Sequence, residues 1–120
     1  MQRSIRGATT IVKDTKENVI KATKELLYYI LTKNSVDSKD IVNIIFTATS
    51  DISSTFPAVA AREIGLINVP LIDCHQMMCD DALELCIRVM LTYNTEKSQE
   101  DIRHVYLHEA KKLRPDLVIE

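Results

Sequence analysis

Apolar residues recur at helical spacing between residues 14 and 33, and this is the most regular hydrophobic pattern in the chain. The spaced positions are Val19, Ile20, Thr23, Leu26, Leu27, Ile30 and Leu31. A stripe with this period predicts one long amphipathic helix. Asp14 is the expected N-cap, with Glu17 three residues later in capping-box spacing. Asn34 is expected to end the helix, because asparagine tolerates the left-handed backbone conformation that stops helices.

Runs of β-branched and apolar residues predict five strands around this helix. They are SIRGATTIVK (4–13), IVNIIFTAT (41–49), INVPLID (67–73), CIRVMLTYN (86–94) and RHVYL (103–107). Residues of this kind favour strands. The second run is apolar nearly throughout, as is typical of a strand covered on both faces. Pro70 confines the third strand to a sheet edge or a bulge.

The segments between the strands predict short helices and turns, without any linker. SDISSTFPAVAAREIG is expected to form a loop and then a short helix, which begins near Pro57 and ends at Gly65. Ser98 is placed to cap one turn before the last strand, and KKLRPDL follows as a tail. We therefore expect a single domain over 1–120. The order of elements predicts an α+β fold, in which a mixed sheet is covered by one long helix and short helices.

Charge and hydropathy exclude several classes of partner. The formal net charge of −2 argues against a nucleic acid or an anionic membrane surface as partner. No apolar run approaches the roughly 20 residues that span a bilayer, and MQRSIRGATT has no apolar signal region. An odd number of closely spaced cysteines fits reduced thiols better than a disulfide framework. We expect a cytoplasmic protein.

All three cysteines lie in the segment CHQMMCDDALELCIRVM (74–90), which raises the question of a metal or thiol site. The spacing of Cys74, His75, Cys79 and Cys86 contains no paired C-x-x-C block, so no metal site is expected. A cysteine nucleophile needs an oriented histidine base, and neighbouring residues of an extended chain point to opposite sides. Cys79 and Cys86 are expected to be small buried hydrophobes, whereas Cys74 closes a strand beside a loop and stays open to either interpretation.

Two arginines stand inside apolar strands. Arg88 and Arg6 must each either extend to the surface at a strand edge or pair with an anion, because an unpaired buried guanidinium is costly. Taken alone, Arg62 and Arg114 are typical surface charges, and Tyr106 is a typical half-buried packing residue with its hydroxyl at the rim. Taken together, the arginines and the tyrosine suit a compact ligand with several carboxylates.

Arginine stays protonated in proteins and cannot act as a proton-transfer base. No Ser–His–Asp, paired-carboxylate or glycine-rich phosphate-binding pattern accompanies these arginines. If such a site is catalytic, it acts by holding the substrate in one conformation and by stabilising developing charge.

Four motifs carry a resemblance to a known family. SIRGATT, FPAVAARE, CIRVML and IRHVYLHEAKKLRPDL resemble the monofunctional bacterial chorismate mutases of the trimeric α+β kind, over the stretch from Ile5 to Leu117. The resemblance implies a homotrimeric pseudo-α/β-barrel with three active sites in clefts between subunits. It also implies rearrangement of chorismate to prephenate, a concerted pericyclic step in phenylalanine and tyrosine biosynthesis, without cofactor or metal.

The resemblance also implies roles for individual residues. Arg88 matches the arginine that donates to the ether oxygen of chorismate, and Arg6 and Tyr106 match the pair that grips a substrate carboxylate. The further substrate-binding positions are Phe56, Ala58 and Arg62 from a neighbouring subunit, Leu71, Ile72, Asp73 and Cys74 along one wall, Met77 beyond them, and Arg114 in the tail. Cys74 matches a pocket cysteine beside the ring hydroxyl.

Two departures from the family pattern affect this set. Met77 stands where the family has a glutamate that accepts a hydrogen bond from the ring hydroxyl, and the segment from there to Cys86 is one residue shorter. Val59 replaces a lysine. We hypothesise that Asp73 or Asp80 supplies the missing acceptor, although strand alternation makes Asp73 awkward without a local twist.

The departures leave two other functions open. One is a non-catalytic trimer that binds a small carboxylate as a sensor or scaffold, which Met77 and Val59 favour. The arginine inside an apolar strand counts against it, because a scaffold has no use for a charge-stabilising group there. The other is a mutase acting on a related cyclic dicarboxylate. All three share the fold, so only turnover separates them.

Overall fold

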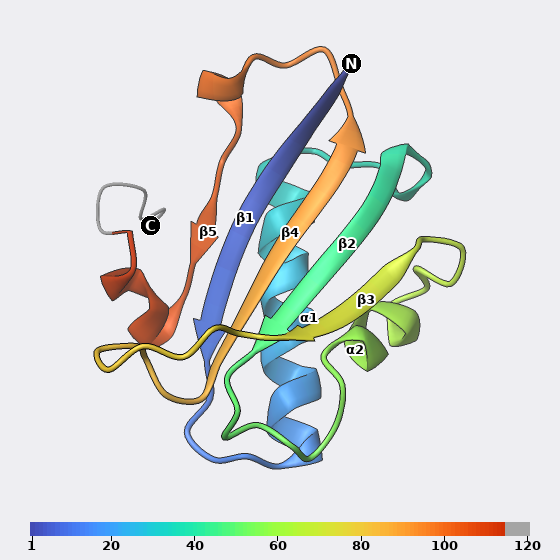
Figure 1. The fold of residues 1–120 in the computed structure, drawn as a ribbon. Coiled ribbons are helices and arrows are strands. Elements are labelled where there is room, and N and C mark those ends of the chain that lie inside the picture. The colour runs from blue at the N-terminus through green and yellow to red at the C-terminus, as the bar shows by residue number, and fades with distance from the viewer. Residues whose placement is uncertain (115–120) are drawn as a thin grey trace.

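The computed structural model describes residues 1–114 and contains a five-stranded mixed sheet (Figure 1). Its strands are β1 (Gln2–Thr10), β2 (Ile41–Ala48), β3 (Leu71–His75), β4 (Cys86–Asn94) and β5 (Val105–Tyr106), in the order β3-β2-β4-β1-β5. β4 is antiparallel to β1 and β2, whereas the edge strands β3 and β5 are parallel to their neighbours. The helices are α1 (Lys16–Lys33) and α2 (Ala58–Glu63), with short 3₁₀ helices at Ser38–Asp40, Gln99–Asp101 and His108–Lys112. The predicted α+β class is confirmed.

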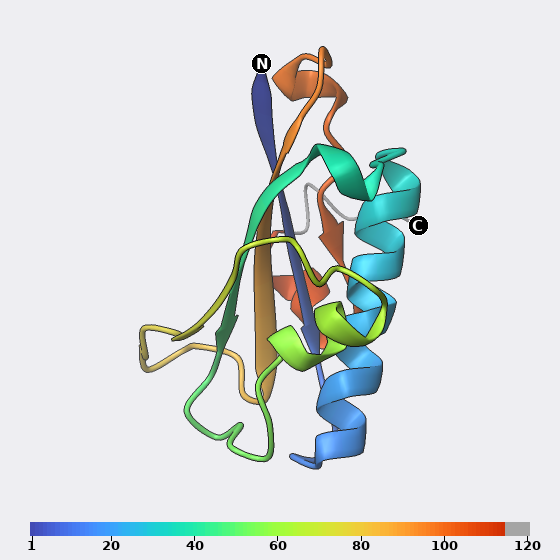
Figure 2. The same cartoon turned by 90° about the vertical axis from the view of Figure 1, so that its right-hand side faces the viewer.

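Both α-helices lie on the same side of the sheet, as the edge-on view in Figure 2 shows. The opposite side is left without a helical layer. We call it the open face, and it carries Ile72, Ile45, Met90, Arg6 and Arg88. The loop between β3 and β4 projects from this side, and in Figure 1 it crosses in front of the strands.

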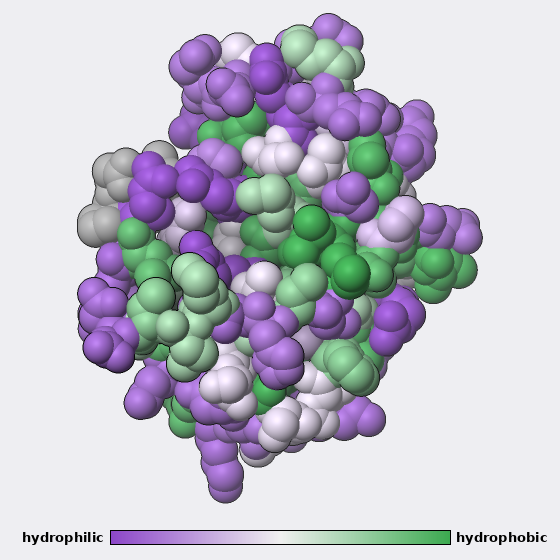
Figure 3. Space-filling view, viewed as in Figure 1, coloured by the Kyte–Doolittle hydropathy of each residue, from purple (hydrophilic) through white to green (hydrophobic). Residues whose placement is uncertain are grey.

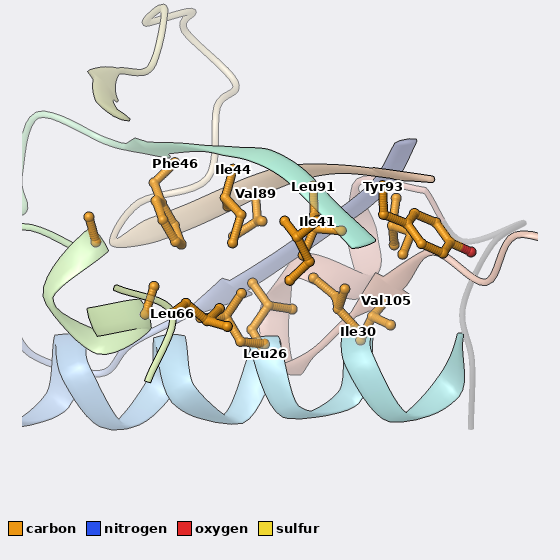
Figure 4. Close-up of a cluster of buried hydrophobic side chains, with 14 of the residues drawn as sticks. Leu26, Ile30, Ile41, Ile44, Phe46, Leu66, Val89, Leu91, Tyr93 and Val105 are labelled. Carbon is orange, nitrogen blue, oxygen red and sulfur yellow. The ribbon is translucent and has the colours of Figure 1, made fainter. Parts of the chain in front are cut away.

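The hydrophobic core fills the space between the sheet and the helices (Figure 4). Leu26, Leu27 and Ile30 of α1 are fully buried and pack against Ile44 and Phe46 of β2 in the same cluster. Burying a side chain of this size contributes about 1.5–3 kcal/mol. The predicted amphipathic stripe is thus the face that attaches α1 to the sheet.

The N-terminus of α1 is capped one residue later than expected. Thr15 is the N-cap, and its hydroxyl accepts a hydrogen bond from the Asn18 backbone N–H at 3.0 Å. The predicted N-cap, Asp14, instead accepts four hydrogen bonds from the backbone N–H groups and hydroxyls of Ser53 and Ser54. These bonds lower the Asp14 pKa, with the Ser54 hydroxyl as the largest cause. Asp14 therefore ties the loop before α2 to the start of α1.

The C-terminus of α1 lies at the predicted residue but has a different geometry. Asn34 is the C-cap with φ −108°, and Ser35 takes the left-handed conformation at φ 51°. The Asn34 side chain is buried and donates to the carbonyl oxygens of Ile30 and Arg103, both at 2.9 Å. The Asn34 amide thus links the end of α1 to the segment that leads into β5.

Four strands differ from their predicted bounds, although β2 differs only by ending at Ala48. β1 ends at Thr10, and β3 begins at Leu71 because the chain is still turning at 67–68 after α2. Pro70 precedes β3, which lies at the sheet edge as predicted. Only Val105 and Tyr106 of the last run pair with β1. β2 is covered on one face alone, because its other side is part of the open face.

The predicted tail KKLRPDL begins as the end of a 3₁₀ helix, and its positions 115–117 lie outside the described residues. Among residues 1–114, no helix combines the length and the apolar character needed to cross a membrane.

Candidate active site

One row of paired residues crosses the whole sheet and carries three of the predicted site residues. The register pairs Cys74 with Thr47, Thr47 with Arg88, Arg88 with Ala8, and Ala8 with Tyr106. Residues paired directly across strands place their side chains on the same face of a sheet. Cys74, Arg88 and Tyr106 therefore lie in one line across the open face, although Cys74 and Tyr106 are 32 residues apart in the sequence.

The adjacent row brings Arg6 beside this line. Ile72, Ile45, Met90 and Arg6 are paired in register, two residues along each strand from the first row. The Arg6 backbone N–H donates to His104 Nδ1 at 2.9 Å, which extends this row toward β5. Arg6 and Arg88 thus occupy neighbouring rows on adjacent strands.

A hollow of about 390 Å³ opens between these rows. Its lining residues are Arg6, Gly7, Ile45, Thr47, His75, Gln76, Met77, Arg88, Val89 and Met90. Arg88 is exposed and Arg6 is half-buried. No carboxylate among residues 1–114 forms an ion pair with either guanidinium. Within the described part of the chain the hollow therefore presents two cations without an ion-pair partner, which suit an anionic ligand.

A second hollow of about 430 Å³ adjoins the first, because Thr47 and His75 line both. Phe56, Cys74 and Asp73 also line it, and the Phe56 side chain is 65% exposed. Cys74 and Asp73, predicted as part of one wall, thus lie beside the hollow that contains the arginines, and so does Phe56 of the same chain, which was expected to contribute from a neighbouring subunit.

Other predicted residues point to the helical side of the sheet. Asp73 is paired with the core residue Phe46, and its carboxylate accepts a hydrogen bond from the Ala58 backbone N–H at 3.0 Å. Burial raises the Asp73 pKa, while the Ala58 hydrogen bond and the Arg62 charge oppose the shift. Within one chain Asp73 thus points away from Arg88, which does not support it as the replacement for the family glutamate, and that role stays a prediction. Asp80, the other candidate, does not line the hollow with Arg88.

The remaining predicted positions on β3 and α2 are also divided between the open face and the helical side of the sheet. Leu71 packs against the core, whereas Ile72 is exposed on the open face. Ala58 is buried in the core with its backbone N–H engaged by Asp73, and Arg62 is exposed at the end of α2. Within one chain, α2 does not bring Arg62 to the open face.

Tyr106 is more deeply buried than predicted. It is 3% exposed and packs with Ala8, Ala110, Leu83 and Leu113, because the loop before β4 and the last 3₁₀ helix cover this end of β1. The expectation of a half-buried ring with a hydroxyl at the rim is wrong for the single chain.

Arg114 lies close enough to His104 for its charge to act on the imidazole, as the charge of Arg6 does. Burial lowers the pKa of His104, and the charges of Arg6 and Arg114 lower it further. A neutral imidazole is what the bond from Arg6 to Nδ1 requires, because a protonated ring has no acceptor nitrogen. The tail residue and the β1 arginine therefore share a histidine neighbour.

The three cysteines differ in exposure. Cys86 is buried as predicted, and burial raises the pKa of its thiol to about 11. Cys79 is exposed, which contradicts the predicted buried position, because the loop that carries it projects from the open face. Cys74 is exposed. In the described part of the chain, no three His, Cys, Asp or Glu side chains are placed to hold a metal ion.

Four polar residues at or beside the site were not predicted from the sequence to belong to it. They are Thr47, His75, Gln76 and His104. Thr47 is a polar residue within an apolar strand, and His75 and Gln76 directly follow Cys74. These positions in the sequence were the signals that could have identified the three residues. For His104 the sequence contains no such signal, because its hydrogen-bond partner Arg6 is 98 residues away.

The chain belongs to the chorismate mutase type I family, whose family model matches residues 2–117. It is 46% identical to chorismate mutase AroH of Thermus thermophilus over 98% of this chain and 97% of that protein. It is 44% identical to chorismate mutase AroH of Bacillus subtilis (strain 168), over 98% and 93%. A solved chorismate mutase from Clostridium thermocellum matches with a TM-score of 0.90 and 42% identity, covering 92% of this chain and 98% of that one.

Proposed function

We propose that this chorismate mutase rearranges chorismate to prephenate against Arg88 and Arg6 on the open face. The observation that carries the mechanism is the pair of guanidinium groups at one hollow, neither of which forms an ion pair with a carboxylate of residues 1–114. Chorismate has two carboxylates and an ether oxygen that gathers negative charge as its C–O bond breaks. A C–C bond forms in the same step, so all atoms and electrons remain in the substrate and no proton is transferred.

Arg88 donates a hydrogen bond to the ether oxygen of chorismate. A preorganised cation aimed at developing negative charge lowers the barrier, because it stabilises the transition state more than the ground state. Arg6 binds a substrate carboxylate, and two-pronged arginine contacts fix orientation as well as charge. Tyr106, at the far end of the Arg88 row, joins Arg6 on that carboxylate. Holding chorismate in its compact reactive conformation supplies the rest of the acceleration.

We propose a homotrimer with the site completed by a neighbouring subunit. Arg62 lies near Asp73, whose side chain is on the helical side of the sheet, while Arg88 is on the opposite face. A second copy is therefore needed to bring Phe56, Ala58 and Arg62 against Arg88. In this proposal Arg114 closes the site from the tail, supported by the effect that its charge shares with that of Arg6 on His104. The three free thiols fit a reducing compartment such as the cytoplasm.

Turnover of chorismate by Arg88→Ala tests this function. Losing a charge-stabilising donor costs at least about 3–4 kcal/mol, so we expect kcat to fall by several hundredfold or more. The disappearance of chorismate and the appearance of prephenate are followed in parallel. Arg103→Ala is the matched control, because Arg103 is an exposed arginine outside the hollow.

Two results would contradict the proposal. Saturable binding of chorismate without turnover would indicate the carboxylate-binding protein considered above. Turnover that survives in Arg88→Ala would assign the charge stabilisation to another group.

A further inference from the structure

Leu85, the residue directly before β4, has a left-handed backbone conformation at φ 48°. Residues with a side chain rarely adopt this conformation, and they keep it only where the surrounding structure holds them there. Arg88 follows three positions later in the chain. The contacts around Leu85 therefore bear on the course of the strand that carries the proposed charge-stabilising arginine.

The backbone at the start of β4 is held by neighbouring segments. The Asp51 carboxylate accepts the Leu85 N–H at 2.9 Å, and the Leu85 carbonyl oxygen accepts the Ile11 N–H at 3.0 Å. The hydroxyl of the fully buried Thr49 accepts the Cys86 N–H at 3.0 Å. The Thr49 N–H also donates to the Cys86 carbonyl oxygen at 3.1 Å. The segments that follow β1 and β2 thus fix the chain where β4 begins.

Asp51 is the residue on which these contacts converge. Its second carboxylate oxygen accepts the hydroxyl of Thr49. A hydroxyl that donates its hydrogen to a carboxylate keeps its lone pairs for the Cys86 N–H, and hydrogen bonds to a carboxylate are stronger than neutral ones. One carboxylate therefore holds Leu85 directly and Cys86 through Thr49.

The contacts of Asp51 continue the pairing of β2 with β4 beyond its last pair. That pair is Ala48 with Ile87, and Arg88 is the next residue. The charges of Arg88 and Asp51 both act on the Cys86 thiol, where the first lowers the pKa and the second raises it. Unheld ends of elements open most readily, so without Asp51 the loose end of β4 would lie close to Arg88.

We propose that Asp51 is a positioning residue for Arg88, because it holds Leu85 in the left-handed conformation and thereby aims the Arg88 guanidinium at the reacting part of the substrate. This inference rests on the proposed function, since it takes the charge-stabilising role of Arg88 as given. Asp51 lines neither the hollow with Arg88 nor the adjoining one. Its loss is therefore expected to lower kcat more than it raises KM, because Arg88 acts mainly on the transition state.

The turnover of three aspartate variants tests this role. Asp51→Ala is expected to lower kcat for chorismate about ten- to a hundredfold and to change KM less than about threefold, as a small misplacement of a catalytic group does. Asp51→Asn keeps an oxygen for the Leu85 N–H and gains an amide that can donate to Thr49, so its kcat should stay within about threefold of wild type. Asp81→Ala is the matched control, because Asp81 is exposed in the loop before β4 and outside the hollow.

A second substitution at Leu85 separates positioning from general damage. Glycine adopts the left-handed conformation readily, so adding Leu85→Gly to Asp51→Ala is expected to raise kcat again by about threefold or more. Leu85 also packs against the buried cluster around Ile87. Urea unfolding should therefore show the double variant to be less stable than Asp51→Ala. A purely structural role of Asp51 cannot produce a kcat that rises while stability falls.

The same change made in Arg88→Ala shows whether Asp51 acts through Arg88. We expect less than about a twofold further fall in kcat, because no guanidinium is left to aim. A further fall as large as that in wild type would overturn the inference. An unchanged kcat in Asp51→Ala would also overturn it.

Crystal structures of wild type and Asp51→Ala give a readout that does not depend on turnover. We expect the Arg88 guanidinium to be displaced by about 1 Å or more in the variant, a shift large enough to account for the loss of rate. An Arg88 that keeps its place would overturn the inference, whether or not the protein is active. If wild type binds chorismate without turning it over, the proposed function fails, while a displaced Arg88 would still support Asp51 as its positioning residue.

Discussion

At the scale of single residues, Arg6 is held in place by a histidine ring. His104 Nδ1 accepts the Arg6 backbone N–H at 2.9 Å, just before the point where β5 begins to pair with β1. The preceding residue, Arg103, is in turn fixed by Asn34, which accepts from its N–H at 2.8 Å and donates to its carbonyl at 2.9 Å. His104 is therefore a positioning residue, which acts on substrate through Arg6.

Protonation of His104 is expected to weaken both the fold and substrate binding. Its folded pKa lies below the ordinary value of 6.5, because of burial and of the Arg6 and Arg114 charges. Arg3 adds a further cation, because it lines a third hollow together with Arg6 and His104. As pH falls below 6.5, the unfolded chain takes up the proton first, so the free energy of unfolding decreases from there toward the lower folded pKa. The protonated ring also releases the Arg6 N–H.

Two substitutions at His104 test this. His104→Leu removes the acceptor and is expected to raise the KM for chorismate about three- to tenfold at every pH, the range of one ordinary hydrogen bond. His104→Asn retains an acceptor oxygen that does not titrate, so it is expected to keep a KM near wild type and to lose the decline of kcat/KM below pH 6.5. Superimposable pH profiles for wild type and His104→Asn would contradict the role given to His104.

At the scale of elements, the contact between β1 and α1 depends on Gly7. A Cβ atom built at Gly7 would lie 2.7 Å from Ile30 Cδ1 and 3.1 Å from Leu26 Cδ1. Leu26 and Ile30 are both fully buried, so neither side chain can shift to make room for a Cβ atom without disturbing the core. The strand that carries Arg6 is therefore seated directly against the helix.

Gly7→Ala is expected to destabilise the fold by about 1–3 kcal/mol, as overpacking of a core typically does. Ile30→Val removes the nearest atom, so the same Gly7→Ala change is expected to cost less in the Ile30→Val background. Urea unfolding of the wild type, the two single variants and the double variant measures this coupling. Equal costs of Gly7→Ala in both backgrounds would show that Ile30 is not the obstacle.

At the scale of the whole molecule, the open face is the surface that an isolated chain leaves uncovered. Ile72, Ile45 and Met90 are paired in one row and are 56%, 38% and 42% exposed. Figure 3 shows apolar side chains gathered in the middle of this face, with polar ones around them. A contiguous apolar patch rimmed by polar residues is typical of an interaction surface, which supports the proposed assembly of three chains.

A charge in this row is expected to break the trimer. Ile45→Lys places an ammonium group in an interface that cannot pair it, so the mass in light scattering should fall from about three times the 13.6 kDa of one chain toward a single chain. Turnover is expected to fall with it, because the site needs a second subunit. Tyr28→Lys, on the exposed side of α1, is the matched control and should leave both unchanged. A monomeric wild type that turns over chorismate would contradict the assembly.

The sequence by itself determined those elements whose signal is local. The stripe of α1 and its end at Lys33, the full span of β4, the start of α2 after Pro57 and the edge position of β3 follow from periodicity and from the backbone limits of single residues. The motifs around Arg6 and Arg88 likewise indicated the family. Such signals are contained in a few neighbouring residues, so they survive without knowledge of the fold.

Which side chains share a face of the sheet became clear from the tertiary structure alone. Strand register turned Asp73 toward α2 and Cys74 toward the open face, and the last 3₁₀ helix covers Tyr106. These facts depend on the pairing of segments tens of residues apart. A shift of register by one residue would reverse every side chain, and no local pattern in the sequence specifies that choice.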